Sequence, residues 1–313
     1  MKKLIFGLVT IVLISGCVGM PDILKGIFPG AGPQVTELPP DLIVIQNINT
    51  LPIPPINTGD QFTVSFEIKN QDEIRDVSGN VTVQLFDYGL CKPDKSSFTP
   101  TGWSESGGVY NYNFNGFDPL QTELIEWTFT APKSEEIAYL STKCPVRFKV
   151  NYSSSATSQV DISVISSTRL KELQRTGQTP TYTPDQTVGR GPLKIYFDFG
   201  TSFPVKSGSI LPVYITIEDK GSGLIEGGDL PKGSLKLNVN TSIFTIDQCD
   251  KFEKVDDSGV KNNQTITMIR KKSIPLKCSF RTPSVDIEKT YLISASLDYS
   301  YSITQEVNVQ IKP

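Results

Sequence analysis

The sequence predicts an all-β fold built from two tandem Greek-key β-sandwiches. Three observations lead to this prediction. Apolar and polar residues alternate along many short segments, Gly, Pro, Asn and Asp cluster between these segments, and the second half of the chain repeats the first. Alternation with a period of two places the apolar side chains on one face of a strand. About seven such segments in each half, separated by turns, form the pattern expected of a Greek-key sandwich.

The alternation is clearest in four segments, at residues 62–68, 146–152, 193–199 and 293–299. In the first of them, Phe, Val, Phe and Ile occupy the even positions, and Thr, Ser and Glu occupy the odd ones. Such a strand buries one face and exposes the other, which is typical of antiparallel sheets that pack in pairs. We therefore expect half-buried antiparallel strands in both halves.

An internal repeat relates the two halves. Residues 55–59 match 204–208, and the alternating strand after each of these turns has apolar residues at matching positions. Residues 108–132 match 259–283 at identical spacing. Near the ends of the repeats, Val160, Ile162 and Val164 match Val307, Val309 and Ile311. A duplication explains these matches.

The first seventeen residues are typical of an export signal that ends in a lipid-attachment site. Lys2 and Lys3 precede an apolar run, and Ile14-Ser15-Gly16-Cys17 forms a lipobox with cysteine at the first mature position. We expect cleavage before Cys17, and a diacylglyceryl group on its thiol would then hold the mature chain to the membrane from outside the cytoplasm. An uncleaved membrane helix is the alternative that we keep open.

These features divide the chain into five parts: a signal peptide at 1–16, a lipid-attached Pro/Gly-rich spacer at 17–40, one sandwich at 41–166, a Pro/Gly/Thr-rich linker at 167–190, and a second sandwich at 191–313. A linker of this composition buries little apolar surface. We therefore expect the two sandwiches to move relative to each other.

The cysteines other than Cys17 fall in pairs within the two halves, as Cys91 with Cys144 and Cys249 with Cys278. In an oxidising compartment an even number of cysteines in each domain predicts one disulfide in each. Four free thiols or a shared metal site is the alternative, although no CxxC spacing supports it. The disulfides Cys91–Cys144 and Cys249–Cys278 are therefore expected.

Through the lipobox and the P-x-x-[ST]-G turn before an alternating strand, at 55–68 and 204–217, the chain resembles prokaryotic, notably archaeal, surface lipoproteins with tandem Ig-like domains of the adhesion-related type. The resemblance covers most of the mature chain and implies Ig-like sandwiches displayed on the cell surface. The two disulfides depart from it, because such domains often lack them.

Composition argues against catalysis. The sequence contains no histidine, which excludes Ser-His-Asp and Cys-His nucleophiles and His-ligated metals. The carboxylate pairs, such as Asp256 with Asp257, lie in expected loops or on outward strand faces and do not reproduce a calcium loop. A net charge of −3 with mixed signs gives no reason to expect nucleic-acid binding. We expect no enzyme activity, no metal and no cofactor.

Two kinds of surface feature remain as candidate sites. Trp103 lies in a loop before a strand rich in aromatic residues, where an aromatic face could stack on a sugar ring, although packing in the core is the alternative. Sequons for N-glycosylation occur at Asn80, Asn151, Asn240 and Asn263, a number close to that expected by chance.

The sequence therefore predicts a non-enzymatic, lipid-anchored cell-surface protein. Its two sandwiches would serve as a binding or spacing module in adhesion or cell-envelope assembly, and its partner would be an unknown surface or envelope protein or a glycan. The alternative is a lipoprotein that captures a solute or glycan and passes it to a transporter or an enzyme.

Overall fold

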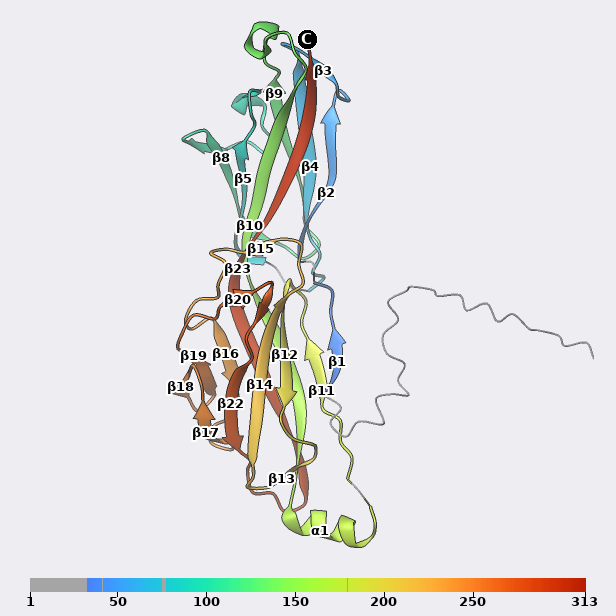
Figure 1. The fold of residues 1–313 in the computed structure, drawn as a ribbon, viewed down its shortest axis with the longest axis vertical. Helices are drawn as coiled ribbons and strands as arrows, with labels where there is room; N and C mark the ends of the chain where they lie inside the picture. The colour runs from blue at the N-terminus through green and yellow to red at the C-terminus, as the bar shows by residue number, and fades with distance from the viewer. Residues whose placement is uncertain (1–32, 41, 75–76, 179) are drawn as a thin grey trace, which may run out of the picture. The chain divides into compact units, whose positions relative to one another are not determined.

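The computed structural model describes residues 33–313 apart from residues 41, 75–76 and 179 (Figure 1). This part of the chain is nearly all β, as predicted, with one α-helix, α1 (Ser167–Arg175), and two short 3-10 helices, η2 (Lys95–Ser97) and η3 (Ser134–Ile137). No helix in the described part is long and apolar enough to span a membrane. The expected signal peptide and lipid-attached Cys17 lie outside the described residues.

The first sandwich consists of two antiparallel sheets. One sheet has the order β2-β4-β9-β6, and the facing strands follow the order β10-β5-β8-β7. Their bounds are β2 (Ile43–Leu51), β4 (Gln61–Asn70), β5 (Val77–Asp87), β6 (Lys92–Pro93), β7 (Ser104–Ser106), β8 (Val109–Phe117), β9 (Thr122–Thr130) and β10 (Thr142–Ile165).

The second sandwich repeats this plan. One sheet has the order β17-β22-β14-β21-β20 with β12 also on β14, and the facing strands include the series β18-β19-β16-β23-β10. The bounds are β12 (Leu193–Phe199), β14 (Ile210–Asp219), β16 (Leu235–Asn238), β17 (Thr245–Cys249), β18 (Phe252–Asp256), β19 (Gly259–Asn262), β20 (Met268–Ile269), β21 (Lys272–Ser273), β22 (Leu276–Arg281) and β23 (Glu288–Lys312).

Five short strands extend these sheets. They are β1 (Gln34–Glu37), β3 (Ile56–Asn57), β11 (Asp185–Val188), β13 (Val205–Lys206) and β15 (Leu224–Ile225).

The predicted alternation of burial is confirmed in β4, where every second side chain is buried. From β4 the ring of Phe66 reaches the facing sheet and stacks on Phe148 of β10, with 4.2 Å between ring centroids. Trp127 of β9 contacts the same Phe148 edge to face at 5.1 Å. These aromatic contacts hold the two sheets of the first sandwich face to face, because each ring buries a large apolar area.

Strands β10 and β23 run through both sandwiches and pair with each other along their whole common length. Every residue of the 24-residue strand β10 has a partner, from Thr142 opposite Ile311 to Ile165 opposite Glu288. In Figure 1 the two strands lie side by side from one end of the described residues almost to the other. We call this pair the β10–β23 ribbon.

The ribbon exchanges the last strand of each repeat between the sandwiches. The C-terminal end of β10 pairs in parallel with β13 of the second sandwich, with Val164 opposite Val205. The C-terminal end of β23 pairs in parallel with β3 of the first sandwich, with Ile311 opposite Ile56. Each repeat thus ends as a strand in the other repeat's sheet, and residues Gly32–Pro313 form a single compact unit.

This exchange corrects the expected domain boundaries at 41–166 and 191–313. The C-terminal end of β10 belongs to the second sandwich, and the C-terminal end of β23 belongs to the first. The expected flexible linker at 167–190 is also wrong in part. It contains α1 and β11, and β11 pairs with β10 and with β1. Within β11, Gln186 and Val188 are fully buried. The spacer at 17–40 is likewise wrong at its C-terminal end, where β1 joins the sheet.

Both expected disulfides are present. Cys91–Cys144 joins the loop before β6 to β10 and so links the two sheets of the first sandwich. Cys249–Cys278 joins two neighbouring strands, β17 and β22, at directly paired positions. Each disulfide lies within one repeat, as the repeat pattern predicts.

Candidate functional site

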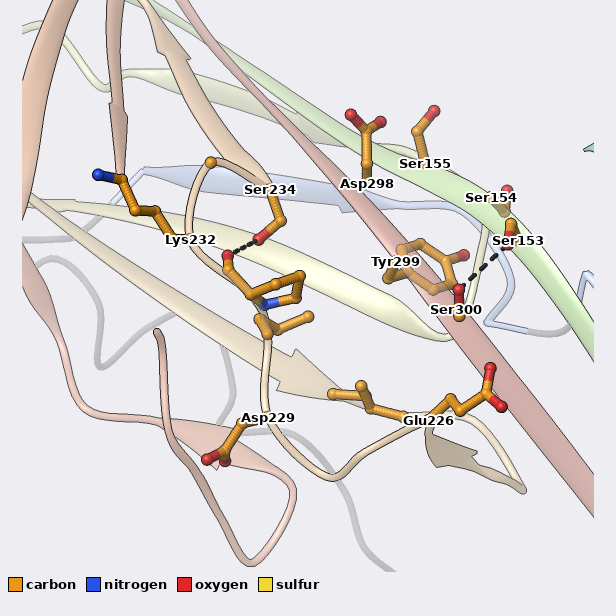
Figure 2. A pocket seen from close by; sticks show the side chains of 14 residues that line it. Ser153, Ser154, Ser155, Glu226, Asp229, Lys232, Ser234, Asp298, Tyr299 and Ser300 are labelled. Carbon is orange, nitrogen blue, oxygen red and sulfur yellow. Dashed lines mark hydrogen bonds between the residues drawn. The ribbon is translucent and has the colours of Figure 1, made fainter. Parts of the chain in front are cut away.

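A pocket of about 630 Å³ lies against the middle of the ribbon, and we call it the β23 pocket. It exists because no strand of the described residues pairs with the outer edge of β23 between β15, which pairs at 301–302, and β16, which pairs at 294–297. The chain between β15 and β16 leaves the sheet here and forms one wall. Residues 153–155 of β10 and 298–300 of β23 also line the pocket (Figure 2).

Backbone hydrogen bonds fix the wall at both ends. The N–H of Glu226 donates to the carbonyl oxygen of Ser300 at 2.9 Å, and the N–H of Asp298 donates to that of Ser234 at 3.0 Å. The hydroxyl of Ser234 in turn donates to the Pro231 carbonyl at 2.7 Å. The wall is therefore tied to the strand that it leaves, and the pocket is built into the fold.

The pocket is lined mainly by hydroxyl and carboxylate groups. Figure 2 shows the serine side chains of both ribbon strands on one side and Glu226, Asp229 and Lys232 on the other. Asp229 accepts a hydrogen bond from the Met268 N–H at 3.1 Å. These groups can donate and accept hydrogen bonds to a polar molecule. In the described part of the chain, no three His, Cys, Asp or Glu residues are placed to hold a metal ion.

A buried polar pair lies beside the pocket, at the residue that follows Ser300 in β23. Tyr301 donates from its hydroxyl to Asp219 at 2.8 Å, and both side chains are buried. Burial raises the pKa of Tyr301 far above its usual value, and the hydrogen bond to the Asp219 carboxylate raises it further. Tyr301 is therefore the donor in this buried hydrogen bond.

The turn at 220–223 packs on this tyrosine. A Cβ atom added at Gly223 would lie 2.2 Å from the carbonyl oxygen of Ser302, and one at Gly221 would lie 2.5 Å from the Tyr301 hydroxyl. Only glycine allows the backbone to approach this closely. Gly221 and Gly223 are thus required by the packing beside β15.

A second pocket, of about 660 Å³, lies beside β11. Its lining includes Thr157 and Gln159 of β10, Ser294 and Ser296 of β23, and Ile74. The side chain of Ile74 is 86% exposed. This pocket is more apolar than the β23 pocket and holds fewer charged groups.

The ligand role expected for Trp103 is wrong. Its side chain is only 4% exposed and lies between Phe98 and Trp127, with ring centroids 5.7 and 5.6 Å away. The indole is part of the core of the first sandwich, and its ring faces are covered by other aromatic residues. The strand that follows, with Tyr110 and Phe114, packs in the same cluster.

The sequons differ in accessibility. Asn240 is exposed, whereas Asn151 and Asn263 are half-buried and each has a buried side-chain oxygen without a hydrogen-bond partner. Asn80 lies in β5 with its backbone opposite Asn115. Accessibility therefore favours Asn240, and use of any of the four remains a prediction.

Sequence reasoning did not find the β23 pocket. Its signal was Ser153-Ser154-Ser155, a run of three serines that interrupts the alternation of apolar residues along β10. The other residues of the pocket are separated from this run by 70 residues or more of sequence, and only the pairing of β10 with β23 brings them together.

Known protein families and curated proteins give no match to this chain. Solved structures give weak matches. Red sea bream transglutaminase matches at 11% identity with a TM-score of 0.19, over 87% of this chain and only 31% of that enzyme. The C-terminal domain of the Streptococcus agalactiae AgI/II polypeptide BspA matches at 10% identity with a TM-score of 0.18, over 82% of this chain and 92% of that one.

The collagen adhesin CNA from S. aureus matches at 10% identity with a TM-score of 0.14, over 89% of this chain and 95% of that one. Superpositions with TM-scores this low establish neither a common fold nor a common role. The function must therefore be argued from the site and the sheets.

Proposed function

We propose that this chain is a non-enzymatic, lipid-anchored cell-surface protein whose two sandwiches serve as a binding or spacing module in adhesion or cell-envelope assembly. The observation that carries the proposal is the β10–β23 ribbon, which runs through both sandwiches without a break. The two disulfides support a location outside the cytoplasm, because cytosolic thiols are kept reduced.

The ribbon favours a spacer over two freely hinged modules. A strand of 24 residues spans about 80 Å at about 3.3 Å per residue. Bending between the sandwiches would break ladder hydrogen bonds of two strands together, and it would also separate side chains of one continuous core. Two sandwiches that share strands in this way would hold a bound partner at a defined distance from the membrane.

The segment that would lead to the lipid is held firmly on the second sandwich. Glu37 of β1 accepts hydrogen bonds from Lys220 at 2.9 Å and from the Tyr196 hydroxyl at 2.8 Å. The buried ammonium of Lys194 donates to the backbone carbonyls of Leu38, Pro39 and Gly189 at 2.5, 3.3 and 2.9 Å. A force applied to an anchor at Cys17 would therefore act on the folded part of the chain through β1.

The anchor is tested by the variant Cys17→Ser. In a bacterial host that processes lipoproteins, the parent chain should incorporate labelled fatty acid and fractionate with membranes. The variant should incorporate no label. Equal labelling of parent and variant, or recovery of the parent chain in the cytosol, would contradict the proposal.

The spacer is tested by distances between spin labels on Lys95 in η2 and Lys171 in α1, both exposed. Attachment through a non-natural amino acid leaves the disulfides intact. We expect one narrow distance distribution that is the same with and without a membrane. A broad distribution would show that the sandwiches move independently, and the spacing role would then fail.

The β23 pocket supports a second candidate function, the capture of a glycan or small polar solute. Hydroxyl and carboxylate groups of the kind found there bind sugars through hydrogen bonds. A glycan array probed with the full chain tests this candidate. Binding that is lost in Asp298→Ala and retained in Trp103→Phe would support it, and the absence of any saturable binding would remove it.

A further inference from the structure

The outer edge of β23 is open along the first sandwich. On this edge β15 pairs with residues 301–302 and β3 pairs with residues 311–312. Between them, residues 303–310 pair with β10 on their other side, and no strand of the described part pairs with them on the outer side. We call residues 303–310 the β23 edge.

The even-numbered residues of the β23 edge direct their backbone groups outward. The carbonyl of Ser300 accepts from the Glu226 N–H on this side, and the carbonyl of Lys312 accepts from the Thr58 N–H. Because the direction alternates along a strand, the even positions between them also face outward. Thr304, Glu306, Asn308 and Gln310 therefore direct a row of N–H and C=O groups away from β10, and no strand of the described residues pairs with this row.

The equivalent edge in the second sandwich is covered. There β11 pairs with residues 158–160 of β10, and the Gly189 N–H donates to the Thr157 carbonyl at 2.8 Å. Val160 beneath this cover is fully buried, whereas its counterpart in the repeat, Val307, is only half-buried. In the second sandwich the edge equivalent to the β23 edge therefore pairs with an extended strand, and the valine at the equivalent position is fully buried.

We propose that the β23 edge pairs antiparallel with the β23 edge of a second copy of this chain, about a two-fold axis at Val307. In this register the two Val307 side chains lie opposite each other. The outward backbone groups of Glu306 bond to those of Asn308 in the partner, and those of Thr304 bond to those of Gln310. Eight backbone hydrogen bonds form, and each half-exposed valine gains an apolar neighbour.

The side chains select this register and allow the pairing. In a two-fold antiparallel pair, opposite residues must lie on the same face, so the nearest other registers are centred on Glu306 or on Asn308. The register centred on Asn308 sets Val307 opposite Val309 of the second copy, and Val309 is already fully buried. The register centred on Glu306 sets Glu306 against Glu306 of the second copy. Like charges directly opposite are destabilising. In the proposed register Glu306 meets an asparagine, and its charge is already balanced by Arg147, whose Nε lies 2.6 Å away.

Within the described residues, the edge also lacks the features that commonly block such pairing. Lysine, proline, bulges and covering loops protect edge strands from association. The outward positions of the β23 edge carry Thr, Glu, Asn and Gln, and their side chains are all exposed. The pairing does not depend on a lipid anchor, so the proposal can hold or fail separately from the proposed function.

Cysteine cross-linking of the full chain in detergent tests the register. Val307→Cys should form a cross-linked dimer by itself, because opposite Cβ atoms at such a position are about 4.5–5.5 Å apart. Glu306→Cys and Asn308→Cys should cross-link at least tenfold more when mixed than when either is alone. A Val307→Cys chain that stays monomeric, or a Glu306→Cys chain that cross-links as well alone as in the mixture, would overturn the proposal.

Asn308→Pro tests the backbone contact. Proline removes one outward N–H and leaves the hydrogen bonds to β10 in place, and proline is tolerated on edge strands. We expect Val307→Cys/Asn308→Pro to lose at least nine-tenths of the dimer with a melting temperature close to that of Val307→Cys. Undiminished dimer would show that another surface mediates association. If the proline variant does not fold, the mixing experiment decides alone.

Discussion

Ser153 and Ser300 lie directly opposite each other in the β10–β23 ribbon, with their hydroxyl oxygens 3.1 Å apart. The repeat matches Val160 with Val307. The same difference in residue number matches Ser153 with Ser300, so these two serines are equivalent positions of the repeat. A residue paired with its own repeat equivalent marks a local two-fold axis. The axis relates the two sandwiches through the ribbon and accounts for the reciprocal exchange of their last strands.

We expect neither repeat to fold alone. A fragment of residues 33–166 lacks β23 and leaves the C-terminal part of β10, with the fully buried Val160, Ile162 and Val164, without its sheet. Exposing three such side chains costs on the order of 5–9 kcal/mol, because each contributes about 1.5–3 kcal/mol. Circular dichroism should show no cooperative melting of this fragment, and mixing it with residues 167–313 should restore the transition. Cooperative melting of the separate fragment near the temperature of the intact chain would contradict the exchange.

Trp103→Ala should lower stability without a specific effect on ligand binding. Removing a buried indole that packs on Phe98 and Trp127 costs about 3–5 kcal/mol. Trp103→Phe is the matched control and should cost less, since the buried indole N–H has no hydrogen-bond partner to lose. Urea unfolding of both variants provides the measurement. If Trp103→Ala kept full stability and lost binding to a glycan, the ligand role would be restored.

Lys194→Met should weaken the attachment of β1 and the residues after it to the second sandwich. The methionine matches the lysine stem in size but removes the ammonium donor from the carbonyls of Leu38 and Gly189. The Pro39 carbonyl keeps its second donor, the Gly191 N–H at 3.3 Å. We expect a loss of roughly 1.5–3 kcal/mol in urea unfolding, the range typical of hydrogen bonds to a charged group. Faster proteolysis near β1 should accompany it. Lys236→Met, at an exposed position of β16, is the control. Similar behaviour of the two variants would argue against the role of Lys194.

Stability should fall between about pH 10 and pH 12. Burial and the hydrogen bond to Glu37 raise the pKa of Tyr196 to about 12. Burial opposes the charge of Lys220, but its hydrogen bonds to Tyr196 and Glu37 raise its pKa to about 12. Both groups bind protons more tightly in the folded state, so their contribution is complete below pH 10 and is lost as the pH rises through 12. Urea midpoints should fall less steeply over this range in Tyr196→Phe. Parallel curves for parent and variant would contradict this assignment.

Local patterns predicted much of the fold. The alternation at residues 62–68 became β4, with the expected face buried, and the even division of cysteines between the repeats gave the correct disulfides. These features depend on neighbouring residues or on the count within a repeat. The location of the Trp103 side chain was harder to predict, because a tryptophan in a loop can lie on the surface or in the core. Only the positions of Phe98 and Trp127 decided its place.

The strand exchange could not be read from the sequence. A β-hairpin and a continuous strand contain the same apolar alternation on both sides of the possible turn, and the run Ser153-Ser154-Ser155 is compatible with either. The β23 pocket depends on the same choice, because its walls come together only when β10 continues beside β23. The prediction of a flexible linker at 167–190 was wrong in part for a related reason. The residues of β11 are mostly polar, and only their pairing with β1 and β10 makes them a strand.

The sequence by itself determined the all-β class, the duplication and the two disulfides of this protein, because each follows from local periodicity or from the order of residues along the chain. The tertiary structure alone decided which repeat supplies the last strand of each sandwich, where the pocket forms and which edge stays open. Those outcomes depend on pairing between residues far apart in sequence. The free energy of that pairing comes from completing two sheets and one core together, so it cannot be inferred from the sequence of any single segment.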